Sequence, residues 1–170
     1  MRDVSHLKGR IAEALVQSIL RRASFRVARV GRETHVQGLM PRSRTEFGPD
    51  FLVWRVEDSE RQLYHLVAVE VKYRANLKDY LATDGRDFVV EARAKWPDLY
   101  CVLVTDKPDD GRSCFQVLRL AQRSPDAELV TINLEDVKEL DVYAATVREY
   151  EGLVTQLFQF LGGQDRRDAS

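Results

Sequence analysis

Apolar side chains recur at helical spacing in three stretches of the chain. In residues 5–23 they follow one another three and four positions apart, which predicts an amphipathic first helix. Residues 86–95 repeat an apolar side chain every four positions and end before Pro97, so a second helix is expected there. In residues 142–161 the spacing alternates between four and three, which predicts a long C-terminal helix.

Short apolar runs between these helices predict strands. Two of them, DFLVWRV and LYHLVAVEVKY, flank the polar stretch EDSERQ and should pair as an antiparallel hairpin. The segment 31–47 lacks periodicity and contains Gly, Pro, Ser and Arg, so a long basic loop is expected there. The predicted strands are FRVARV (25–30), DFLVWRV (50–56), LYHLVAVEVKY (63–73), LYCVLVT (99–105), CFQVLRL (114–120) and a weaker LVTI (129–132).

The order of these elements indicates one α/β domain. A helix, three strands, a second helix and further strands follow in turn, so we expect a central mixed sheet flanked by helices, with an extra C-terminal helix. A chain of 170 residues, 44% of them hydrophobic, can bury one sizeable core. We therefore assign residues 1–161 to a single domain and residues 162–170 to a disordered C-terminal tail.

Charge and cysteine content narrow the classes of function. The 26 basic residues are offset by 27 acidic ones, so any surface for nucleic acid must be a local patch. The N-terminus has no apolar signal core and no run reaches membrane-spanning length, which predicts a cytoplasmic protein. Cys101 and Cys114 lie inside apolar runs without metal-ligand spacing, which is typical of reduced, packed thiols.

Two carboxylates are expected to meet at one end of the hairpin. Strand side chains alternate between faces, so Glu70 and Lys72 share one face of their strand. If the hairpin is symmetric about Glu60, Asp50 lies opposite Glu70. Directly opposed like charges are destabilising, so this register calls for a cation. Mg²⁺ binds one or two carboxylates together with water and phosphate, and Lys72 is placed to orient that water or to neutralise developing charge.

Each of these residues also has an ordinary interpretation. Glu13 lies at the edge of the apolar stripe of the first helix, where it either leans toward Asp50 or simply stabilises a surface helix. By composition alone, Asp50, Glu70 and Lys72 would more commonly be a turn aspartate and a salt bridge on a solvated face. The run LVAVEV is apolar on both faces, as in a strand buried within a sheet, and this favours the metal site.

Three segments of the chain, KGRIAE, GPDFLV and VAVEVK, resemble the PD-(D/E)xK nuclease superfamily, most closely its archaeal Holliday-junction-resolvase branch. The likeness covers roughly residues 8–74. It implies a restriction-endonuclease-like αβββαβ core and a Mg²⁺-dependent endonuclease acting on DNA, with Mn²⁺ as a substitute. It also implies metal ligation by Asp50, Glu70, Val71 and Glu13, with Lys72 assisting catalysis. The 31–47 loop departs from the resolvase pattern, so the likeness does not define junction specificity.

Basic residues from the loop and the strand ends are expected near this site, where they either hold DNA phosphates or are ordinary solvated charge. The stripe of the C-terminal helix either packs on the chain's own sheet or forms the seam of a homodimer. These basic residues are Arg29, Arg32, Arg42, Arg44, Arg74 and Lys78.

The sequence leaves two other functions open. A catalytically silent nucleic-acid-binding or assembly module on the same fold would need no divalent cation at Asp50 and Glu70. A nuclease toxin or defence component would share the hydrolytic chemistry and differ from a repair enzyme only in its target.

Overall fold

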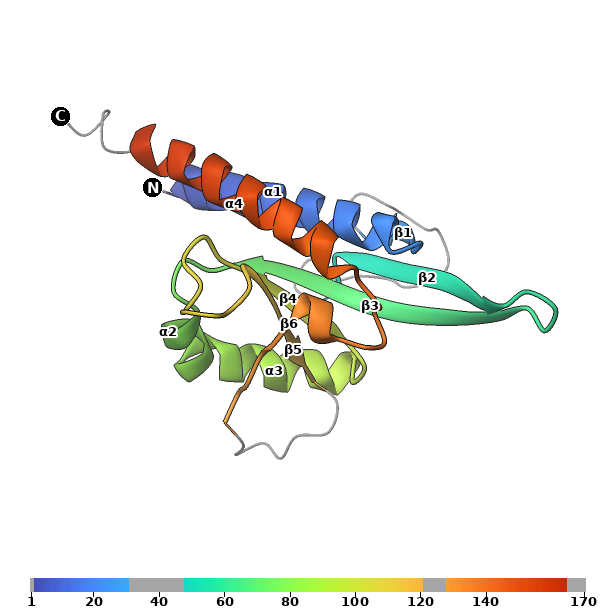
Figure 1. The fold of residues 1–170 in the computed structure, drawn as a ribbon. Helices are drawn as coiled ribbons and strands as arrows, with labels where there is room; N and C mark the ends of the chain where they lie inside the picture. Colours follow the sequence, from blue (N-terminus) through green and yellow to red (C-terminus); the bar gives the residue numbers. More distant parts are fainter. Residues whose placement is uncertain (1, 31–47, 121–127, 165–170) are drawn as a thin grey trace.

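A six-stranded mixed sheet forms the centre of the computed structural model, which describes residues 2–30, 48–120 and 128–164 (Figure 1). The strands lie in the sheet in the order in which they follow in the chain. All neighbouring pairs are antiparallel except β3 and β4, which are parallel. The strands are β1 (Arg26–Arg29), β2 (Phe51–Asp58), β3 (Leu63–Tyr73), β4 (Tyr100–Val104), β5 (Phe115–Arg119) and β6 (Ile132–Asn133).

Helices cover both faces of this sheet. Figure 1 shows α1 (Arg2–Arg22) and α4 (Ala144–Gln164) side by side on one face, and α2 (Leu77–Ala82) with α3 (Asp84–Lys95) on the other. A short 3₁₀ turn, η1 (Leu134–Asp136), links β6 to the segment before α4. The expected mixed sheet between helices is therefore confirmed. None of the helices in the described part of the chain combines the length and the apolar character that a membrane span requires.

Two apolar clusters form the core, one on each face of the sheet. Between the sheet and the α1–α4 layer, Val16 and Ile19 of α1 pack with Val69 of β3, all without solvent exposure. The second cluster lies under α3 and includes Leu103 and the thiol of Cys101. Cys101 and Cys114 are both free and buried, which confirms that they are packed thiols.

The apolar stripe of α4 packs inside the molecule. Val147 and Val154 are completely buried, and Tyr150 is 9% exposed and bonded through its hydroxyl to Ser18 of α1. These side chains belong to the same cluster as α1 and the sheet. The expectation that this stripe packs on the chain's own sheet is therefore confirmed for its central residues, which are already covered and not free to form the homodimer seam that was its alternative.

Several boundaries differ from those predicted. The last helix begins at Ala144 and continues to Gln164, so the first residues of the expected tail are helical. The six-residue helix α2 was not predicted. The weak strand expected over 129–132 is reduced to Ile132–Asn133, paired at the sheet edge with β5. The predicted loop 31–47 and residues 165–170 lie outside the described part of the chain.

Candidate metal centre

The hairpin of β2 and β3 has the register that its symmetry predicts. Leu52 pairs with Ala68 and Trp54 pairs with Leu66, so the partners are reflections about Glu60. This register is fixed by the alternation of buried and exposed side chains, since a slip of one residue would turn the core-facing side chains of β3 to the opposite face. Asp50 immediately precedes the first paired residue of β2 and is therefore next to Glu70 of β3.

Asp50 is anchored to the backbone of β3. Its Oδ2 accepts a hydrogen bond of 2.7 Å from the amide of Val71. Strand β3 continues past the start of β2, so this amide lies beyond the last β2–β3 pair and the carboxylate supplies its missing acceptor. Val71, which the family resemblance placed among the metal ligands, thus contacts Asp50 through its N–H.

Glu70 and Lys72 project from β3 on the face that α3 covers. Glu70 is 8% exposed, and its Oε1 lies 2.7 Å from the ammonium nitrogen of Lys72. The same ammonium nitrogen lies 4.5 Å from the centre of the Phe88 ring of α3, within the range of a cation–π contact. A solvated surface salt bridge is therefore not what forms here, because the glutamate is buried and the lysine is held between a carboxylate and an aromatic ring.

Burial and their mutual proximity shift the pKa values of the two carboxyl groups. Burial raises the pKa of Glu70 to about 7; the Lys72 charge opposes this rise, and the Asp50 carboxylate adds to it. Burial also raises the pKa of Asp50, despite the hydrogen bond from Val71 and the charge of Lys72. Around neutral pH Glu70 is therefore only partly ionised, and one lysine does not neutralise both acids.

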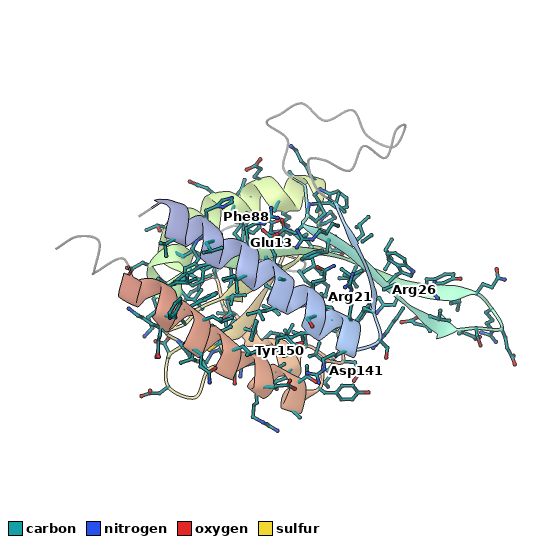
Figure 2. The ribbon with its side chains drawn as sticks, turned by 90° about the horizontal axis from the view of Figure 1, so that it is seen from above. Glu13, Arg21, Arg26, Phe88, Asp141 and Tyr150 are labelled. Carbon is teal, nitrogen blue, oxygen red and sulfur yellow. The ribbon has the colours of Figure 1, made fainter. Side chains whose placement is uncertain are left out.

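Glu13 approaches this pair from the other side of the sheet. Figure 2 marks Glu13 on α1 and Phe88 on α3, the helices that cover opposite faces. The pKa of Glu13 is raised by partial burial and by the charge of Asp50, so the two carboxylates interact electrostatically. Arg29 of β1 lies 3.2 Å from Glu13 and opposes the rise. Glu13 thus belongs to the same electrostatic cluster as Asp50.

The proposed DNA contacts are distributed unevenly around this centre. Arg29 pairs with Glu13 and lies over the Phe51 ring, at 5.3 Å. Arg74 directly follows the end of β3, and its guanidinium lies 4.4 Å from the centre of the Tyr80 ring. Lys78 pairs with Asp109 beside a separate surface hollow, whose lining residues include none of the three site residues of the hairpin. Arg32, Arg42 and Arg44 lie outside the described residues.

Three features of the surroundings were missed by sequence reasoning. Helical periodicity explains the position of Phe88 but does not predict that its ring lies under Lys72. No sequence pattern predicts the pairing of Arg29 with Glu13. The third is a buried cluster on the opposite face, where Lys8 contacts both Tyr73 and Asp106 at 3.2 Å. The sequence could have indicated this cluster, because Lys8 is a charged residue on the buried stripe of α1.

The carboxylates of this cluster do not form a complete metal-binding group. Within the described ranges, no three His, Cys, Asp or Glu side chains converge as a ready metal-binding group. The ammonium of Lys72 contacts Glu70, and the guanidinium of Arg29 contacts Glu13, in the places that a cation would compete for. Comparisons with known proteins found no matching family model, no matching curated protein and no matching solved structure.

Proposed function

We propose that this protein is a Mg²⁺-dependent nuclease that hydrolyses phosphodiester bonds in DNA at Asp50, Glu70 and Lys72. The observation that carries the proposal is the pair formed by the buried Glu70 and the half-buried Asp50 at the end of the hairpin, with Lys72 bonded to Glu70 and the Val71 amide bonded to Asp50. Buried acids of this kind bind a cation or hold a proton, and clusters with perturbed pKa values are common at functional sites.

Each residue has a distinct role in this proposal. Asp50 and Glu70 provide the hard oxygen ligands that Mg²⁺ prefers, and Asp50 is held in place by the Val71 amide. When bound there, the ion would polarise the scissile phosphate and acidify a water molecule. Lys72 would then be released from Glu70 to face the charge that develops on the phosphate, with Phe88 limiting where its ammonium can lie.

The nature of the substrate rests on sequence likeness and on charge. The segments KGRIAE, GPDFLV and VAVEVK resemble PD-(D/E)xK nucleases, and the αβββαβ order of that family agrees with the order of elements here. Arg29 contacts Glu13 and Arg74 follows Lys72 closely in the chain, so both would contact phosphates, with Glu13 as an auxiliary ligand. Free buried cysteines agree with a role in the reducing cytoplasm.

Cleavage of labelled DNA tests this proposal directly. Duplex, single-stranded and four-way-junction DNA are incubated with the protein in Mg²⁺, in Mn²⁺ or in EDTA. We expect metal-dependent cutting that falls by about a hundredfold or more in Asp50→Asn and in Lys72→Ala. The matched controls are Asp110→Asn and Lys107→Ala, which change the same residue types on the surface and should cut normally. Cutting that persists in Asp50→Asn would contradict the proposal.

A catalytically silent nucleic-acid-binding module is the second candidate, and one observation favours it. Lys72 and Arg29 already neutralise part of the charge of Glu70 and Glu13, as in a structural cluster that needs no metal. In that case every DNA form would remain intact in Mg²⁺ and Mn²⁺, while gel-shift binding would persist in EDTA. Metal-dependent cutting by a toxin or defence nuclease would look identical and would differ only in the preferred target.

A further inference from the structure

The β2–β3 hairpin extends beyond the rest of the sheet as a two-stranded arm (Figure 1). Strand β1 pairs with β2 only as far as Trp54, and β4 pairs with β3 only from Val69 onward. Among the described strands, none therefore pairs with the outer edges of residues 55–66, which we call the arm. A two-stranded ribbon is marginally stable alone, so both of its faces need support.

One face of the arm packs on the body of the molecule. Arg55 lies over the ring of Phe25, 5.0 Å from its centre, and reaches Asp141 at 3.4 Å. His65, directly opposite Arg55 in the ladder, lies beside the same Phe25 ring. This face is therefore already supported by Phe25, between α1 and β1, and by the segment before α4.

The opposite face carries a patch of apolar side chains. Trp54 is paired with Leu66 and Val56 with Tyr64, so all four point to the same side. Val56 is 49% exposed, Tyr64 59% and Leu66 63%, and they form one contiguous surface. We call these four residues the arm patch. Large apolar patches on a protein surface commonly mark interaction sites, whereas single exposed apolar residues are ordinary.

The charges at the two ends of the arm patch are opposite. At the tip, the acidic residues Asp58 and Glu60 are accompanied by Arg61, which pairs with Asp58, whereas Glu57 lies 3.8 Å from His65 of the supported face. At the root, Arg26 lies directly opposite Trp54 in the β1–β2 pairing, so its side chain lies on the patch side. Figure 2 shows Arg26 at this root.

We propose that the arm patch is the contact between two copies of this chain, related by a two-fold axis with the arms antiparallel. In this arrangement the acidic tip of each arm meets the basic root of the other, and the two apolar patches cover one another. A two-fold interface requires a self-complementary surface, and opposite charges at the two ends of an apolar patch supply that. A polyanion would instead be repelled by the acidic tip.

The oligomeric state of the full chain tests this proposal without any substrate, so its failure would leave the proposed nuclease untouched. Sedimentation equilibrium should show a reversible dimer, and Leu66→Glu should raise its dissociation constant by more than about tenfold. The matched control is Phe160→Glu on α4, an exposed aromatic of similar accessibility at 66%, which should leave the dimer intact. Circular dichroism verifies that both variants are folded.

Charge exchange tests the antiparallel geometry separately. Arg26→Glu and Glu60→Arg should each raise the dissociation constant by about fivefold, because each contact occurs twice in a two-fold dimer. The double variant should restore the wild-type value. Amide hydrogen exchange over residues 55–66 should also slow as protein concentration rises. A monomer at every concentration would overturn the proposal, and so would a dimer that Phe160→Glu breaks and Leu66→Glu does not. A monomer whose arm-patch variants lose DNA binding would also overturn it.

Discussion

Individual residues at the carboxylate pair determine how the metal-free protein responds to pH. Glu70 and Asp50 both hold their protons to higher pH in the folded chain than in an unfolded one, chiefly because they are buried. The pair therefore favours folding while it is protonated and opposes folding once it ionises.

The sequence was sufficient to predict that Asp50, Glu70 and Lys72 lie together, because strand alternation and hairpin symmetry can be read from residue spacing. How deeply Glu70 is buried could not be predicted, because this depends on how α3 packs over that face of the sheet.

The metal-free protein should lose stability as pH rises from about 4.5, the ordinary value for Glu70, through its folded pKa of about 7. Over that range the loss should approach about 3 kcal/mol, since each pH unit of difference is worth about 1.4 kcal/mol. Urea unfolding in EDTA at a series of pH values measures it. Glu70→Gln should flatten the dependence of stability on pH, and Mg²⁺ should make the wild-type dependence less steep. An unchanged pH dependence in Glu70→Gln would show that Glu70 is not the group responsible.

Lys8 should be the most sensitive charged residue on the opposite face. Its ammonium and the Tyr73 hydroxyl both bond to Asp106, at 3.2 and 2.8 Å; the two contacts outweigh burial and lower the pKa of Asp106. Lys8→Met should destabilise the protein by about 3 kcal/mol in urea unfolding, because it leaves a largely buried carboxylate without its charge partner. Adding Asp106→Asn should recover part of the loss, and strictly additive losses would argue against the coupling.

At the scale of elements, periodic segments were predictable and short ones were not. The repeat of Phe88, Ala92 and Trp96 defined α3 because four-residue spacing places these side chains on one face, which packs on the second core cluster. Helix α2 contains only six residues, too few for a period to emerge. The parallel pairing of β3 with β4 also has no local signal, since a crossover brings the strands together.

Two glycines in helices provide a matched test of element packing. A methyl group at Gly85 would meet the carbonyl oxygen of Tyr80 at 2.8 Å, whereas one at Gly152 of α4 would meet nothing within 4 Å. Gly85→Ala should therefore destabilise the protein by about 1–3 kcal/mol through forced displacement of the α2–α3 junction. Gly152→Ala should stabilise it by up to about 1 kcal/mol. Thermal unfolding of both variants checks the opposite signs, and equal shifts would contradict the packing described.

At the scale of the whole molecule, the sheet brings together residues that are distant in sequence. Asp50 and Glu70 meet because one hairpin joins them, and sequence symmetry was sufficient to predict this. Glu13 reaches the same cluster only because α1 packs across the sheet and Arg29 lies in the edge strand beside it. Long-range packing of that kind fixes which charges neutralise one another, so the ion pairs around the candidate site could not be read from spacing.

Calorimetric titration of the protein with Mn²⁺ is the most direct test of the central claim that Asp50 and Glu70 bind a divalent cation. At pH 7 we expect binding accompanied by proton release, detected in two buffers of different ionisation enthalpy, because Glu70 has a pKa of about 7 and must ionise to bind the metal. Asp50→Asn and Glu70→Gln should abolish that binding, and Asp109→Asn should preserve it. No binding to the wild type, or binding that Asp50→Asn leaves unchanged, would contradict the claim.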